Sequence, residues 1–254
     1  MDYHPFLTEL HARLAPQTYL EIGIRNGGSL ALSRCRSVAI DPAYSITFEL
    51  DGDYAIFRTS SDEYFARPDP LAPTGGRPFD FAFIDGLHIF EYTLRDFIHA
   101  ERYCSPKAMI IFDDMLPRTV PEAARVRHTK AWTGDVYRII AVLEEYRPDL
   151  TVVPIGTTPT GMLMIAGLDP SNTVLSDNYQ EILRDFRHPD PQPVPEQLMD
   201  RLTVPRPEKI LQSRLFEFLA DADPATPTAE LQTAVSELVG ADLGPAFGPT
   251  TQAS

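Results

Sequence analysis

Thr18-Tyr-Leu-Glu-Ile-Gly-Ile-Arg-Asn-Gly-Gly-Ser-Leu30 is the stretch that decides how this 254-residue chain folds. Its first residues are apolar or β-favouring and predict a short strand that ends at Gly23. A polar, glycine-rich turn follows, and a short helix is predicted from Ser29 to about Ser33. A strand, a glycine turn and a helix N-terminus together form a place to bind a nucleotide-like ligand, because glycine lets a ligand come close to the main chain.

The spacing of the glycines narrows the ligand class. A dinucleotide fingerprint would need glycines at positions 23, 25 and 28, but position 25 is Arg. The pattern present, Glu21-x-Gly23-x-x-x-Gly27-x-Ser29, resembles the first motif of the class I S-adenosylmethionine-dependent methyltransferases. This resemblance implies that the donor S-adenosylmethionine is held by Glu21, Gly23, Asn26, Gly27 and Ser29. The alternative is a helix-capping turn with incidental glycines.

Composition excludes several classes of partner. The net charge of -14 argues against nucleic acid and against an anionic membrane surface, since both need clustered Lys and Arg. No stretch is long and apolar enough to span a bilayer, and the N-terminus lacks a signal pattern. The two cysteines, Cys35 and Cys104, do not indicate a disulfide scaffold. We expect a cytoplasmic protein.

The second and third strands carry further donor candidates. A strand over 37–41 ends at Asp41, 18 residues past Gly23. A carboxylate there can accept hydrogen bonds from a ribose diol; an ordinary Asp-Pro turn with Pro42 is the alternative. After a strand over 54–59, the resemblance places Ser61 near the adenine, although Ser61 or Asp62 can equally cap the helix that opens at Glu63.

Acidic residues follow the next two predicted strands. The apolar run 79–85 ends at Asp85, a helix with its apolar face on Phe90, Leu94, Phe97 and Ile98 follows, and the run 108–112 precedes Asp113 and Asp114. Since ligands bind outside the carboxyl ends of parallel strands, all three acids should face one crevice. Carboxylates that converge in this way suit a hard divalent cation such as Mg²⁺; plain turn and cap residues are the alternative.

These acids resemble the metal site of the macrocin-type small-molecule O-methyltransferases. The resemblance implies that Asp85, Asp113 and Asp114 hold the metal, with Asp85 also near the donor. Those enzymes have a second acid two residues after the first Asp, proposed as the general base, whereas this chain has Leu87. The base role therefore passes to His88 or is lost; a histidine that only hydrogen-bonds its neighbours is the alternative.

The loop 115–133 is long, basic and contains Trp132, and we interpret it either as a lid over the pocket or as a solvated loop. Strands over 150–155 and 161–166 are joined so closely that they must form an antiparallel hairpin. The predicted fold is therefore α/β and Rossmann-like: five parallel strands closed by an antiparallel hairpin, with helices on both faces. This is the class I methyltransferase sheet.

Past residue 170 the chain predicts extra C-terminal helices, over 175–186, 211–219 and 231–239, with a proline-rich linker after 187. We divide the chain into a methyltransferase domain, 1–186, and a linker with a helical extension, 187–254. The extension must bury its apolar faces on the main domain or on a second subunit, and we expect a homo-oligomer such as a dimer. The last ten residues are expected to be disordered.

The expected activity is methyl transfer from S-adenosylmethionine to a hydroxyl of a small molecule, a sugar or a secondary metabolite, assisted by Mg²⁺. An NAD-linked oxidoreductase and a non-catalytic scaffold that keeps the ligand pocket are the alternatives. Arg25 and the predicted hairpin both argue against the oxidoreductase.

Overall fold

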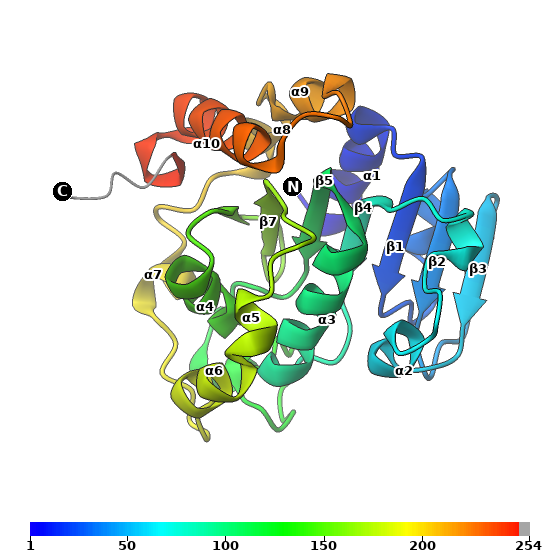
Figure 1. Cartoon of the computed structure of the whole chain (residues 1–254). Helices are drawn as coiled ribbons and strands as arrows, with labels where there is room; N and C mark the ends of the chain where they lie inside the picture. The colour runs from blue at the N-terminus through cyan, green and yellow to red at the C-terminus, as the bar shows by residue number, and fades with distance from the viewer. Residues whose placement is uncertain (249–254) are drawn as a thin grey trace.

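The computed structural model describes residues 1–248 and is built on one seven-stranded sheet (Figure 1). Its strands lie in the order β3-β2-β1-β4-β5-β7-β6. Their bounds are β1 (Thr18–Ile22), β2 (Arg36–Ile40), β3 (Asp53–Phe57), β4 (Phe79–Ile84), β5 (Cys104–Phe112), β6 (Thr151–Ile155) and β7 (Met162–Ala166).

The pairing confirms the predicted sheet. Strands β1 to β5 pair in parallel, and β7 pairs antiparallel with both β5 and β6. The second strand of the hairpin is thus inserted between β5 and β6. Because the first five strands run the same way, Gly23, Asp41, Asp85 and Asp113 all follow their strands at the same edge of the sheet.

One face of the sheet is covered by helices from the middle of the chain: α2 (Ser61–Phe65), α3 (Phe90–Tyr103), α4 (Ile139–Tyr146), α5 (Val174–Asp177) and α6 (Tyr179–Phe186). Leu20 and Ile22 of β1 point into this core, since side chains alternate along a strand. The helix predicted over 175–186 is divided into α5 and α6 at Asn178.

The opposite face is covered by the two ends of the chain, as Figure 1 shows. Helix α1 (Tyr3–Leu14) lies there in contact with α8 (Pro207–Leu211) and α9 (Leu215–Asp221), and α10 (Thr228–Leu243) packs beside α9. Between β1 and β2 the chain forms a single 3₁₀ turn, η1 (Leu30–Leu32), and residues 41–52 between β2 and β3 form no helix. The short helix predicted from Ser29 to about Ser33 is therefore present as this 3₁₀ turn, and the terminal helices bury the apolar surface that these short connections leave.

The C-terminal extension packs on its own sheet, so the first of the two packing alternatives is the one observed. A homo-oligomer stays a prediction. The remaining short elements are η2 (Ala72–Thr74), η3 (Val120–Ala123), η4 (Val136–Arg138), α7 (Glu196–Asp200) and η5 (Pro245–Phe247). The expected disorder is wrong for η5, and for residues 249–254 it lies outside the described part. Within the described residues, no helix is long and apolar enough to cross a membrane.

Candidate active site

Gly23 is required by the close approach of two strand ends. Its φ is 90°, and a Cβ at this position would lie 2.0 Å from the carbonyl oxygen of Asp85. Its amide also donates to the carbonyl of Ile40 at 2.9 Å. Any side chain here would push β1 away from β4, so this glycine sets the shape of the turn at the edge where the acids gather.

Glu21 holds the turn from the inside. It is fully buried, and its carboxyl oxygens accept from the Ser29 hydroxyl at 2.7 Å and the Tyr19 hydroxyl at 2.8 Å. Burial raises the pKa of Glu21 to about 8. Glu21 and Ser29, both predicted to hold S-adenosylmethionine, are therefore hydrogen-bonded to each other. The side chain of Asn26 accepts a hydrogen bond from the Gly28 amide at 3.2 Å. Their contact with a donor stays a prediction.

Asp41 closes the turn from the β2 side. Its Oδ2 accepts from the amides of Ile24 at 2.9 Å and Arg25 at 2.8 Å, and its Oδ1 accepts from the Ala43 amide at 2.6 Å. The carboxylate lies beside the glycine turn, where the prediction placed it. Three of its lone-pair positions are already used by backbone donors, so the Asp-turn role is visible in the structure and the ribose role stays a prediction.

Ser61 lies at the start of α2, but the helix cap is Ser60. Ser60 accepts from the Glu63 amide while Glu63 returns a bond to the Ser60 amide, which is a capping box. The expectation that Ser61 or Asp62 caps this helix is therefore wrong by one residue. The Ser61 hydroxyl donates to the buried carboxyl of Asp96, and its predicted contact with adenine stays a prediction.

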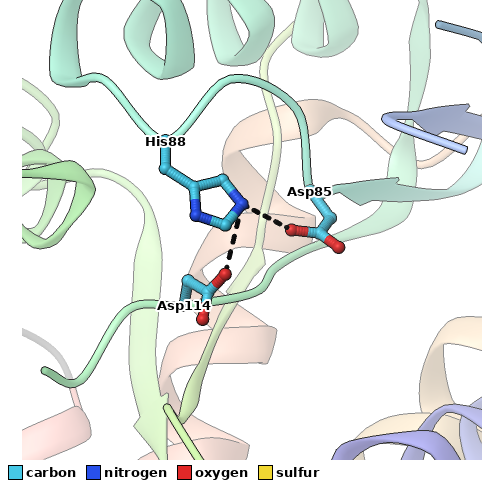
Figure 2. Close-up of side chains that lie close together, drawn as sticks. All are labelled: Asp85, His88 and Asp114. Carbon is cyan, nitrogen blue, oxygen red and sulfur yellow. Dashed lines mark hydrogen bonds and ion pairs between the residues drawn. The ribbon is translucent and has the colours of Figure 1, made fainter. Parts of the chain in front are cut away.

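His88 lies between two of the predicted acids, as Figure 2 shows. Its Nε2 is 3.2 Å from Asp85 Oδ1 and 3.2 Å from Asp114 Oδ2. On the other side of the ring, Nδ1 is 2.8 Å from the carbonyl oxygen of Trp132, and the two rings stack at 5.1 Å. A carbonyl only accepts, so Nδ1 carries hydrogen and Nε2 is the nitrogen that gains or loses a proton.

The two carboxylates stabilise the charged form of His88. Burial opposes that charge, but the hydrogen bond to Asp85 and the charges of Asp114 and Asp85 raise the pKa of His88 to about 9. Burial also raises the pKa of Asp114 to about 6 and holds that of Asp113 well above its usual range, with the neighbouring acids adding to the rise. The cluster therefore needs a positive charge at its centre.

The metal set differs from the predicted one. Ligand atoms of Asp85, His88 and Asp114 all lie within 4.8 Å of one another, whereas Asp113 is not part of this group. Asp113 instead accepts from the Asp114 amide at 2.8 Å, in a turn where Asp114 has a φ of 61°. The group that converges closely enough to hold an ion thus contains His88 and not Asp113, and metal binding by Asp85, Asp113 and Asp114 stays a prediction. Two carboxylates and an imidazole fit a divalent cation.

The loop 115–133 folds back on the protein. Arg125 forms ion pairs with Glu91 at 2.6 Å and Asp135 at 2.5 Å, so its charge is used inside the protein. The indole of Trp132 donates to the carbonyl of Ala124 at 2.6 Å while its ring covers His88. The segment is therefore packed at Arg125 and Trp132 and exposed over residues 126–128, and its action as a lid stays a prediction.

Two residues of the site were not found by sequence reasoning. Tyr3, at the start of α1, has its pKa raised by burial, and the charges of Asp113 and Asp85 add to the rise. His4 Nε2 is 3.0 Å from the carbonyl oxygen of Gly28. The apolar spacing of Phe6, Leu7, Leu10 and Leu14 predicts a helix over 3–14, but no local pattern shows that its first turn crosses to the glycine turn.

A cavity of about 720 Å³ lies away from this chemistry, between α1 and η1. It is lined by residues such as His11, Arg34 and Arg77 and by none of the predicted site residues. We place the candidate site by its converging side chains, because catalysis depends on the groups that touch the reactants.

Comparison with known proteins agrees with this geometry. Residues 20–115, which run from β1 to just past β5, match the family model described as a methyltransferase domain. No curated protein matches the sequence significantly. The methyltransferase-domain match over residues 20–115, the strand order and the glycine turn together confirm the predicted resemblance to class I methyltransferases.

Several solved structures are similar in part. The O-methyltransferase from Bacillus cereus in complex with SAH is 18% identical, with a TM-score of 0.47, over 64% of this chain and 79% of that one. The O-methyltransferase TomG from Streptomyces achromogenes, involved in tomaymycin synthesis and in complex with SAM, is 21% identical, with a TM-score of 0.45, over 63% and 78%. The SAH-bound methyltransferase PaMTH1 from Podospora anserina is 15% identical, with a TM-score of 0.46, over 64% and 76%.

Proposed function

We propose that this protein transfers the methyl group of S-adenosylmethionine to a hydroxyl of a small molecule, with His88 as the base. The observation that carries the proposal is the position of His88 Nε2 between Asp85 and Asp114, at the same sheet edge as the glycine turn. A donor held by the turn and a proton acceptor a strand or two away are what an O-methyl transfer needs.

The reaction is a direct displacement. Because its pKa is raised to about 9, His88 must first release its Nε2 proton to solvent before it can act as the base. The acceptor oxygen then attacks the methyl carbon, the carbon–sulfur bond breaks with its electron pair going to sulfur, and the hydroxyl proton passes to His88 Nε2. The products are the methyl ether and S-adenosylhomocysteine. Asp85 and Asp114 stabilise the imidazolium that forms, while the Trp132 carbonyl keeps Nδ1 protonated. Since the sulfonium methyl is already electrophilic, the protein mainly orients the two reactants.

A divalent cation such as Mg²⁺ is the second possible occupant of the same cluster. Held by Asp85, Asp114 and His88, it would supply positive charge that acidifies the acceptor hydroxyl. His88 Nε2 has one lone pair, so it cannot ligate a cation and take a proton at the same time. The two arrangements therefore predict different effects of chelation.

We further propose that the acceptor is a sugar or another secondary-metabolite alcohol. The support is the resemblance of Asp85 and the Asp113-Asp114 pair to the acids of macrocin-type enzymes. Leu87 stands where those enzymes have a second acid, and its side chain is 52% exposed. It therefore offers an apolar surface next to His88, where the methyl acceptor would bind. An acceptor that carries its hydroxyl on a partly apolar body fits such a surface.

The test has two stages. Calorimetry with S-adenosylhomocysteine and with NAD distinguishes the methyltransferase from an NAD-linked oxidoreductase, because Arg25 occupies the position where a dinucleotide site needs glycine. Mass spectrometry of acceptor mixtures incubated with methyl-labelled donor then identifies the acceptor. The proposal would be contradicted if the protein bound NAD but not S-adenosylhomocysteine. It would also be contradicted if the protein bound the methyl donor but methylated no sugar or metabolite alcohol, and that result would favour a non-catalytic scaffold.

A further inference from the structure

The first four residues form a strap across the edge of the sheet that carries the site. The Tyr3 amide donates to the carbonyl of Thr158 at 3.1 Å, and the Thr158 amide donates to the carbonyl of Met1 at 3.1 Å. These bonds tie the strap to the loop between β6 and β7. At its other end, the His4 ring reaches the glycine turn through Nε2 and the Gly28 carbonyl, 3.0 Å apart.

The helix behind the strap fixes the position of the His4 ring. Phe6, Leu7 and Leu10 of α1 are fully buried against the sheet, so the start of the helix cannot move independently of β1. Since the Gly28 carbonyl can only accept, His4 Nε2 carries the hydrogen and donates it. The bond therefore joins a rigid helix to the end of the turn that consists of the adjacent glycines Gly27 and Gly28.

The glycine turn is also held on its opposite side. The Ser45 amide donates to the carbonyl of Arg25 at 2.7 Å, and the Thr47 amide donates to the carbonyl of Asn26 at 2.9 Å. His4 supplies a contact from the α1 side, on the residue that directly precedes Ser29. A turn with adjacent glycines at 27 and 28 has many accessible conformations, and each fixed carbonyl reduces them.

We propose that His4 is a positioning residue for the methyl donor, and that its bond to Gly28 holds the glycine turn in the conformation that binds S-adenosylmethionine. The proposal rests on the proposed function, because it takes the turn as the donor site. It assigns a role to the first turn of α1 that the methyltransferase match over residues 20–115 does not cover.

A purely structural role for His4 is the alternative, and a second histidine of the same helix provides the matched control. His11 lies two turns later and packs on the rings of Tyr19 at 4.7 Å and Phe81 at 5.0 Å. It has no contact with the glycine turn among the described hydrogen bonds. Replacing His11 should loosen α1 without releasing Gly28.

The experiment measures the dissociation constant for S-adenosylhomocysteine by calorimetry and the melting temperature of each variant. His4→Ala should raise that constant about fivefold, the effect of one lost neutral hydrogen bond. His4→Gln, whose amide can also donate to the Gly28 carbonyl, should restore most of the affinity. His11→Ala should lower the melting temperature and leave the dissociation constant unchanged.

Two results would overturn the assignment of His4. One is an unchanged dissociation constant in His4→Ala; the other is an equal rise in His4→Ala and His11→Ala, which would mean that any loosening of α1 weakens the site. Failure of the proposed function looks different, because the wild-type protein itself would then not bind S-adenosylhomocysteine.

Discussion

The C-terminal helices should be indispensable for folding, although they lie outside the segment that matches a methyltransferase domain. Nine of their apolar side chains are buried against the sheet: Ile210, Leu211, Leu215, Phe216, Leu219, Leu231, Val235, Val239 and Leu243. At about 1.5–3 kcal/mol for each buried side chain, they contribute roughly 14 kcal/mol or more. The entropy of ordering the extension offsets much of this figure, but removing the extension also exposes the sheet surface that these side chains cover, so a chain that ends at residue 188 should be strongly destabilised.

A point substitution makes the same argument quantitative. Phe216 is 2% exposed, and Phe216→Ala should lower the free energy of unfolding by about 3–5 kcal/mol. Leu202, in the same extension but 86% exposed, is the control, and Leu202→Ala should change it by less than about 0.5 kcal/mol. Urea unfolding followed by circular dichroism measures both. Equal effects of the two substitutions, or a shortened chain with an unchanged melting temperature, would refute this account of the second layer.

Three further predictions concern the site and α1. Asp41→Ala should weaken S-adenosylmethionine binding by about 1.5–3 kcal/mol, the scale of charge-assisted hydrogen bonds; unchanged affinity by calorimetry would leave Asp41 as a turn residue. If a metal is required, chelation should abolish activity and Mn²⁺ or Mg²⁺ should restore it, and Asp114→Asn, within the group that could hold the ion, should cost more than Asp113→Asn beside it; full activity in excess chelator would exclude the metal. Burial lowers the pKa of His11 to about 4 in the folded protein, below its unfolded value of about 6.5. The free energy of unfolding should therefore be highest above pH 6.5 and fall by about 3 kcal/mol at most as the pH drops toward 4. His11→Phe should remove this part of the pH dependence when unfolding is measured in urea.

The sheet could be predicted from the sequence because each strand is a short apolar run with a clear stop. Gly23 and Pro42 mark two of these ends, and the short link between β6 and β7 leaves only an antiparallel pairing. The C-terminal helices were predicted, but the face of the sheet that they cover could not be, because it is set by what the β1–β2 and β2–β3 connections leave uncovered. The helix expected from Ser29 is reduced to a single 3₁₀ turn, and no local signal shows that residues near 215 and 235 replace it.

The sequence predicts where the backbone places the acidic residues of the site, but it does not predict which groups their carboxylates contact. Parallel strands bring Asp41, Asp85 and Asp113 to one edge whatever their side chains do. Where each carboxylate points depends on nearby backbone amides, and Asp41 and Asp113 both turn toward such amides. Tyr3 and His4 reach the site from a helix that precedes the motif, so their role depends on tertiary packing.

The presence of Leu87, where macrocin-type enzymes have a second acid, is consistent with the position of His88 between Asp85 and Asp114. Three carboxylates at the end of neighbouring strands repel one another and need a positive charge among them. In this chain the residue after Leu87 supplies it, since His88 Nε2 lies 3.2 Å from both Asp85 and Asp114. A second acid at position 87 would add charge that a single imidazolium could not balance. The cluster is therefore consistent with a proton on His88 at its centre, and a divalent cation would have to displace that proton before it could bind there.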